Sequence, residues 1–221
     1  MSLPPIEIET APHPVATVLV MHGLGADGND FVPIARELDL SAVGPVRFIF
    51  PNAPVMPVTL NGGMPMPAWY DILGTDLAKR EDEAGLRRSQ TAIETLIAKE
   101  KTRGIPAGRI VVAGFSQGCA MALMTGLRHG ERLAGIVGLS GYLPLAALTA
   151  AERHGANHDT PVFLAHGTRD GMVPVARAIA SRDALTALGH PVEWHDYPME
   201  HSVCMEEIAD LNNFLLRVLG A

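Results

Sequence analysis

One serine of the chain lies in a setting that could make it a nucleophile. Ser116 is the centre of Gly114-Phe-Ser-Gln-Gly118, which has the pattern G-x-S-x-G. This motif directly follows a β-branched segment, 109–113, and precedes an apolar segment, 117–128. A strand, a sharp turn and a helix in this order would project the serine hydroxyl above a sheet, and glycines at both ends would avoid collisions in the turn. We therefore predict that Ser116 is a nucleophile that a neighbouring base activates.

Nine histidines are candidates for that base. His201 lies between a predicted strand at 192–197 and a predicted helix at 205–219, so its loop would reach over the strand ends toward Ser116. His22 and His166 also follow strands, but each begins a His-Gly pair in a tight turn, and we interpret them as residues that shape their loops. His201 is the predicted general base.

The acid that orients the imidazole is predicted at Asp170. This residue follows a predicted strand at 161–165 and precedes a predicted helix at 175–188. A carboxylate there would accept a hydrogen bond from the ring nitrogen that faces away from the serine. The order serine, acid, histidine along the chain is an established order for such triads. The alternative is that Asp170 serves only as a turn or cap residue.

A developing oxyanion needs two hydrogen-bond donors. The backbone N–H of Gln117, the residue after the nucleophile, is one candidate, and its place at a helix N-terminus adds a favourable partial charge. The second should come from the loop after an early strand, and 22–25 follows the predicted strand 16–21. We predict Leu24 N–H as this second donor.

The elements that must position these groups alternate along the chain. Short apolar runs typical of buried strands are separated by amphipathic segments typical of helices. This alternation predicts an α/β fold with a mostly parallel sheet and helices on both faces. With 221 residues and no linker or repeat, a single domain over 1–221 is expected. Further strands are predicted at 46–50 and 133–139, further helices at 29–38 and 81–102, and mainly loop at 141–160.

Residues 51–75 are rich in Pro, Gly and Met, and we expect a long loop there. Long loops in compact domains often carry function. We hypothesise that this loop lines an acyl pocket through Met64, Met66, Trp69 and Tyr70, because methionine adapts to flexible chains and aromatic rings add apolar area. The alternative, that Trp69 and the methionines only pack the loop onto the core, is equally compatible with the sequence.

Composition excludes several classes of function. With 17 Lys and Arg against 24 Asp and Glu, the net charge is −7 and no basic run is present, so a nucleic-acid partner is not expected. Two cysteines are too few for a disulfide framework. His154 and His158 lack a clear third ligand, so no metal site is predicted. Without a signal segment or a long apolar run, we expect a cytoplasmic protein with no stable membrane insertion; a homodimer remains open.

Six segments spread over nearly the whole chain carry a family resemblance. They are HGLGADGND at 22–30, FPNAP at 50–54, AWYDI at 68–72, GFSQG at 114–118, HGTRDGMVP at 166–174 and HS at 201–202. Together they resemble the phospholipase/carboxylesterase family of α/β-hydrolases, which includes small bacterial carboxylesterases and acyl-protein thioesterases. Two departures from the family pattern bear on pocket shape. Cys119 stands in place of a second glycine after the G-x-S-x-G turn, called the nucleophile elbow, and no glycine is present at 198–200.

The resemblance implies an α/β-hydrolase fold without a large lid domain, and a cofactor-free enzyme that uses the triad and the two oxyanion donors named above. We expect a serine carboxylesterase that hydrolyses small-molecule esters with short to medium acyl chains through an acyl-enzyme. An acyl-protein thioesterase or a lysophospholipase with the same triad is the main alternative. A peptidase or transferase with this triad stays open, and a non-catalytic binding protein would ordinarily lack a triad residue.

Overall fold

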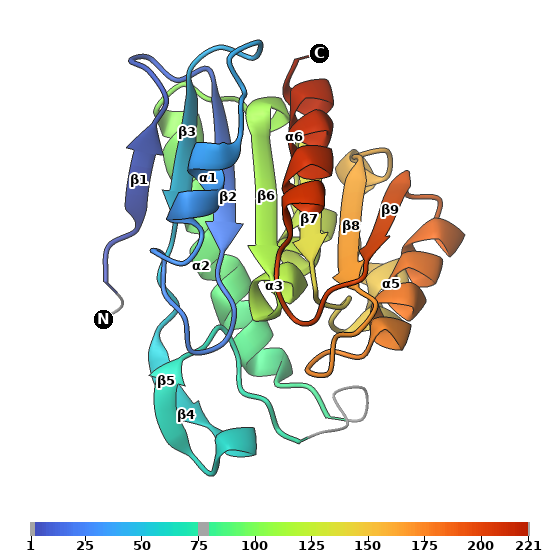
Figure 1. Ribbon diagram of the computed structural model, residues 1–221. Coiled ribbons are helices and arrows are strands. Elements are labelled where there is room, and N and C mark those ends of the chain that lie inside the picture. Colours follow the sequence, from blue (N-terminus) through green and yellow to red (C-terminus); the bar gives the residue numbers. More distant parts are fainter. Residues whose placement is uncertain (1–2, 75–79, 221) are drawn as a thin grey trace.

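The computed structural model describes residues 3–74 and 80–220 and has a seven-stranded sheet at its centre (Figure 1). The strand order is β1-β3-β2-β6-β7-β8-β9. Every neighbouring pair is parallel except β1 and β3, which are antiparallel. The strands are β1 (Ile6–Glu9), β2 (Ala16–Met21), β3 (Val46–Phe50), β6 (Ile110–Phe115), β7 (Gly135–Leu139), β8 (Val162–Gly167) and β9 (Val192–Tyr197).

Helices cover both faces of this sheet, and the predicted α/β class is confirmed (Figure 1). Two separate apolar clusters fill the space between the layers, one on each face. The short α4 (Ala146–Glu152) lies in the segment that we expected to be mainly loop. On one face lie α1 (Val32–Glu37) and α6 (Met205–Leu219), and on the other α2 (Glu83–Thr102), α3 (Gln117–Arg128) and α5 (Val175–Ala187).

The segment 51–75 is not the plain loop that its composition predicted. It contains an antiparallel hairpin of β4 (Val55–Val58) and β5 (Met64–Pro67), which projects beyond the carboxyl ends of the parallel strands (Figure 1). Proline is tolerated in such a two-stranded ribbon because each strand has a free edge that needs no N–H donor. Gly62 and Gly63, with φ of 67° and 80°, supply the left-handed backbone that closes the turn.

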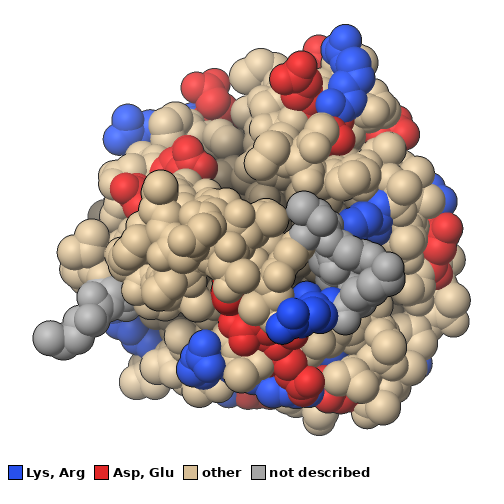
Figure 2. Space-filling view, turned by 90° about the horizontal axis from the view of Figure 1, so that it is seen from below, with Lys and Arg blue, Asp and Glu red and all other residues tan. Residues whose placement is uncertain are grey.

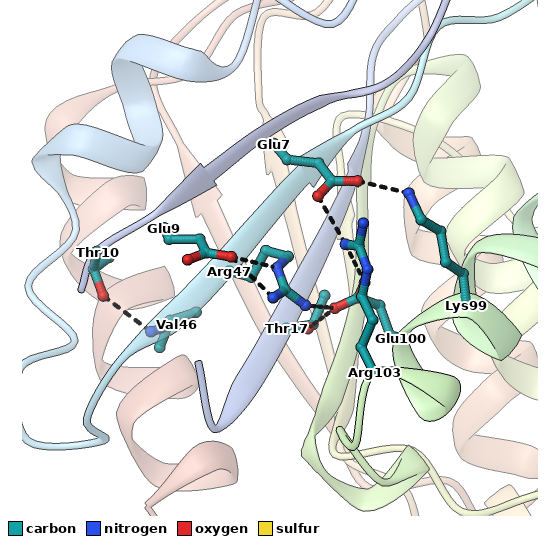
Figure 3. A network of polar contacts seen from close by, with 9 residues as sticks. All are labelled: Glu7, Glu9, Thr10, Thr17, Val46, Arg47, Lys99, Glu100 and Arg103. Carbon is teal, nitrogen blue, oxygen red and sulfur yellow. Dashed lines mark hydrogen bonds and ion pairs between the residues drawn. The ribbon is translucent and has the colours of Figure 1, made fainter. Parts of the chain in front are cut away.

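The strand β1 was also absent from the prediction. Its Ile6 and Ile8 are half-buried while Glu7 and Glu9 face outward, and Glu7 and Glu9 join a polar network (Figure 3). That alternation is the pattern of a strand with one face against a core. Because the run is only four residues long and half acidic, it gave a weak signal.

At the centre of this network lies Glu100 of α2, whose side chain is fully buried (Figure 3). Its Oε2 accepts hydrogen bonds from Thr17 Oγ1 of β2 at 2.7 Å and from Arg47 Nη1 of β3 at 2.6 Å. Arg103 Nη1 lies 2.9 Å from its other oxygen. Arg47 in turn pairs with Glu9 at 2.9 Å. The network therefore holds three strands against one helix.

A second buried carboxylate, Glu207, lies in the first turn of α6. Burial raises the pKa of this group to about 8, well above its value in an unfolded chain. Between pH 4.5, the ordinary pKa of a glutamate, and about pH 8, only the folded state keeps the proton on Glu207. The free energy of unfolding therefore falls as pH rises through this range. We expect the free energy of unfolding of Glu207→Gln, relative to that of the wild type, to increase by about 2–3 kcal/mol from pH 5.5 to pH 7.5, at about 1.36 kcal/mol per pH unit.

Urea unfolding of both proteins at the two pH values measures this difference. The isosteric amide leaves the remaining titratable groups unchanged, so subtraction isolates the contribution of Glu207. A stability gap between variant and wild type that stays constant with pH would contradict the raised pKa.

Candidate active site

The turn from β6 into α3 holds Ser116 in an uncommon backbone conformation. Its φ of 56° and ψ of −116° lie where non-glycine residues are rare, and its N–H donates to Leu139 O at 2.9 Å. A Cβ on Gly114 would collide with the backbone of Gly118, and one on Gly118 would collide with the backbone of Met21. Both glycines of the motif are thus required by close approach, as the sequence predicted, and the hydroxyl is presented at the carboxyl edge of the sheet.

His201 contacts both of the residues predicted as its partners. Its Nδ1 lies 2.6 Å from Asp170 Oδ2, and its Nε2 lies 2.9 Å from Ser116 Oγ. A carboxylate can only accept, so Nδ1 carries the proton and Nε2 is left to accept from the serine hydroxyl. The structure therefore brings Ser116, His201 and Asp170 into one hydrogen-bonded chain from three separate loops.

The Asp170 carboxylate is held in place by its own loop. Its Oδ1 accepts the backbone N–H groups of Met172 and Val173, each at 2.8 Å, while Oδ2 faces His201. This local pattern is an Asx-type turn, so the turn role considered for Asp170 coexists with the contact to the imidazole. The two amide donors fix the orientation of the carboxylate, so that Oδ2 faces His201.

The loops of Asp170 and His201 are packed backbone against backbone. The N–H of Arg169 donates to Met199 O at 3.0 Å, and that of Thr168 to Tyr197 O at 2.8 Å. A Cβ on Gly167 would collide with the carbonyl oxygens of Met199 and Glu200. A residue without a side chain is therefore needed at 167 for the loop of His201 to approach so closely.

The two rival histidines hydrogen-bond to loops beside the site, and His166 Nε2 also lies 3.3 Å from Asp170 Oδ2. His22 Nε2 accepts the N–H of Ala53 at 3.1 Å, and its Nδ1 lies 2.7 Å from Gly23 O. His166 Nε2 donates to Val173 O at 2.8 Å. Burial lowers the pKa of both rings. Each therefore fixes a neighbouring loop as a neutral side chain, in keeping with the interpretation from sequence.

Cys119, one of the two departures from the family pattern, is a second potential nucleophile close to Ser116 in sequence, and it is buried in α3. Burial raises the pKa of its thiol to about 12, so it carries no thiolate at neutral pH. Its side chain occupies the space that a Cβ on Gly141 would enter. This departure from the family pattern thus alters packing beneath the site and not the reacting groups.

The predicted oxyanion donors both line the same cleft as the nucleophile. Gln117 is the first residue of α3, and Leu24 lies in the loop after β2, where a Cβ on its neighbour Gly23 would be 3.3 Å from Ser116 Cβ. No backbone acceptor within residues 3–74 and 80–220 takes the N–H of Leu24 or of Gln117. Among the described residues, both N–H groups therefore remain candidates to donate to an oxygen beside Ser116.

A cleft of about 640 Å³ opens at Ser116 and His201. Two of the four predicted pocket residues, Met66 and Tyr70, line it, and the other two do not. Trp69 is buried beneath the cleft, and Met64 is 61% exposed. Met64 is the first residue of β5, two residues before Met66 and next to the turn at the tip of the hairpin, and it does not line the cleft. The apolar lining comes mainly from Leu60, Met66, Tyr70, Ile72, Met172 and Val173.

Tyr142, Met172 and Val173 are lining residues that the sequence analysis did not single out. Met172 and Val173 lie inside the motif at 166–174, so proximity to Asp170 was the available signal. Figure 2 views this edge of the molecule and shows a broad area around the hairpin without charged side chains among the described residues. The entrance is therefore suited to an apolar group.

Within 3–74 and 80–220, no cluster of three or more His, Cys, Asp or Glu side chains could hold a metal ion. Over the same ranges, none of the helices combines the length and the apolar character needed to cross a bilayer.

Comparison with known proteins shows which family shares this sequence and fold. The family model described as phospholipase/carboxylesterase matches residues 5–219. The chain is 42% identical to acyl-protein thioesterase 1 of Yarrowia lipolytica, covering 96% of each chain. It is 44% identical to that of Mycosarcoma maydis, over 94% of this chain and 93% of the relative. Among solved structures, acyl-protein thioesterase 2 of Zea mays superposes with a TM-score of 0.80 at 29% identity, over 97% of this chain and 99% of that one. The chain therefore belongs to the phospholipase/carboxylesterase family and is a serine hydrolase with the α/β-hydrolase fold.

Proposed function

We propose that this enzyme is an acyl-protein thioesterase, which hydrolyses the thioester between an acyl chain and a protein cysteine. The observation that carries the proposal is the near full-length similarity, at 40–44% identity, to several proteins named acyl-protein thioesterase 1. The cleft agrees with it, because its apolar lining fits an acyl chain. This alternative is better supported than the small-ester carboxylesterase that we expected from sequence.

The reaction follows from the contacts at Ser116. His201 Nε2 takes the hydroxyl proton while Oγ attacks the thioester carbonyl, and the N–H groups of Leu24 and Gln117 stabilise the oxyanion. The carbon–sulfur bond breaks, the proton passes from His201 to the leaving thiolate, and the acyl group stays on Ser116. Water then attacks this ester with the same proton transfers and releases the carboxylic acid.

A matched pair of substrates tests the proposal. One peptide would carry an acyl group on a cysteine sulfur, and the other the same group on a serine oxygen, with chains from acetyl to palmitoyl. We expect kcat/KM at least about tenfold higher for the thioester, with longer chains preferred, which corresponds to about 1.4 kcal/mol of transition-state discrimination. Equal or faster hydrolysis of the oxoester, with short chains preferred, would instead establish the carboxylesterase.

The two methionines of β5 offer a test of the acyl cleft itself. Met66 lines the cleft, and Met64 lies exposed at the tip of the hairpin. We expect Met66→Ala to lower kcat/KM for long acyl chains by about fivefold to thirtyfold, because about one to two kcal/mol of apolar contact is lost, with little change for acetyl. Met64→Ala is the matched control. A chain-length profile that Met66→Ala leaves unchanged would remove β5 from the acyl site.

A further inference from the structure

The dipeptide Trp69-Tyr70 holds both sides of the oxyanion site at once. The indole N–H of Trp69 donates to His22 O at 2.9 Å, at the start of the loop that carries Leu24. The backbone N–H of Trp69 donates to Gln117 Oε1 at 2.8 Å, and Gln117 Nε2 donates to Tyr70 O at 2.7 Å. Two N–H donors from distant parts of the chain are thus tied to one short segment.

These bonds are in the interior of the protein, where they are strongest and where their loss is most costly. Trp69 and Gln117 are 4% and 3% exposed, and His22 is 1% exposed. The indole also packs on the His22 ring, with 5.2 Å between ring centroids. Water cannot readily replace the indole N–H at His22 O, so the carbonyl would be left without a donor if that group were removed.

The loop between His22 and Gly25 is fixed from both ends. His22 O is held by the indole of Trp69, and Gly25 N–H donates to Pro67 O at the end of β5 at 2.8 Å. Between these two anchors lies Leu24, whose N–H makes no bond to a backbone acceptor among the described residues. The direction of that N–H is therefore set by two nearby anchors. One is Pro67, the last residue of β5, and the other is Trp69, two residues later.

We propose that Trp69 is a positioning residue for the oxyanion hole, acting through His22 O and the Gln117 side chain on the two N–H donors. This proposal rests on the proposed function only because both concern the site at Ser116. It does not depend on the substrate class, since any ester or thioester that reacts at Ser116 forms the same oxyanion. Trp69 then has a role that neither the acyl-pocket hypothesis nor simple core packing gave it. Preorganised donors matter most in the transition state, so the effect falls on kcat.

Trp69→Phe tests the proposal, because phenylalanine retains an aromatic ring and lacks the indole N–H. With p-nitrophenyl butyrate we expect kcat to fall by about tenfold to a hundredfold with KM within about twofold, since complete removal of one oxyanion donor costs about 10²–10³. The matched control is Trp194→Phe, at the half-buried tryptophan of β9, which is expected to stay within about twofold of wild type.

A trifluoromethyl ketone provides a readout that core packing alone would not move. Ser116 Oγ adds to its carbonyl carbon while His201 Nε2 takes the hydroxyl proton, and the carbonyl oxygen becomes an oxyanion that accepts from the two N–H groups. We expect its inhibition constant to rise by the factor by which kcat/KM falls in Trp69→Phe, with melting temperatures recorded for both variants. A kcat within about twofold of wild type, or a loss of kcat with unchanged affinity for the ketone, would overturn the proposal. A failure of the thioester preference would leave this result intact, because the substrate is an oxoester.

Discussion

Ser116→Ala is expected to lower kcat for both thioester and oxoester substrates by at least about a thousandfold. The Oγ atom that lies 2.9 Å from His201 Nε2 is the nucleophile of the proposed reaction, and alanine has no atom to take its place. Residual turnover would come from the oxyanion donors and from binding alone. Steady-state assays of purified wild type and variant, with the same substrate, measure the loss.

A second serine beside the base provides the control. Ser202 is adjacent to His201 in sequence and is exposed to solvent. Ser202→Ala should therefore retain activity within about twofold of wild type. Equal turnover by wild type and Ser116→Ala, at comparable purity, would show that another residue performs the attack.

Glu100→Ala is expected to destabilise the protein by about 3–5 kcal/mol. Removing the carboxylate leaves the Arg47 guanidinium nearly buried, with an 11% exposed side chain, and deprives it of its 2.6 Å partner. The Thr17 hydroxyl loses its acceptor as well. Urea unfolding at pH 7 measures the change in the free energy of unfolding.

An exposed ion pair between α2 and the loop that precedes β7 makes a suitable comparison. Lys101 pairs with Glu131, and the two side chains are 37% and 53% exposed. Glu131→Ala should therefore cost less than about 1 kcal/mol. If both substitutions had equally small effects, the network around Glu100 would contribute no more than an ordinary surface pair.

The arrangement of the candidate triad could be predicted from sequence because its signals are local. The elbow at Ser116 needs a strand, two glycines and a helix within a short stretch, and each is visible in the residue types. Asp170 and His201 follow because each lies after a recognisable strand, and parallel strands end at one edge of a sheet.

What the sequence did not predict depends on contacts between distant segments. The hairpin of β4 and β5 carries prolines that mask its strand pattern, and the places of Met64 and Trp69 follow only from how that hairpin and the residues after it pack on the loop after β2 and on α3. Likewise β1 is a strand only because β3 offers it an edge and Arg47 pairs with Glu9. Such elements owe their form to tertiary partners more than to intrinsic propensity.

The placement of β1 has a consequence for self-association. An unprotected sheet edge is a template on which another chain can add a strand, and an apolar edge favours aggregation. Without β1, that edge would be β3, whose sequence Val-Arg-Phe-Ile-Phe has one charged residue in five. By covering it with a four-residue strand that presents Glu7 and Glu9, the protein ends its sheet on a short acidic segment that resists further pairing.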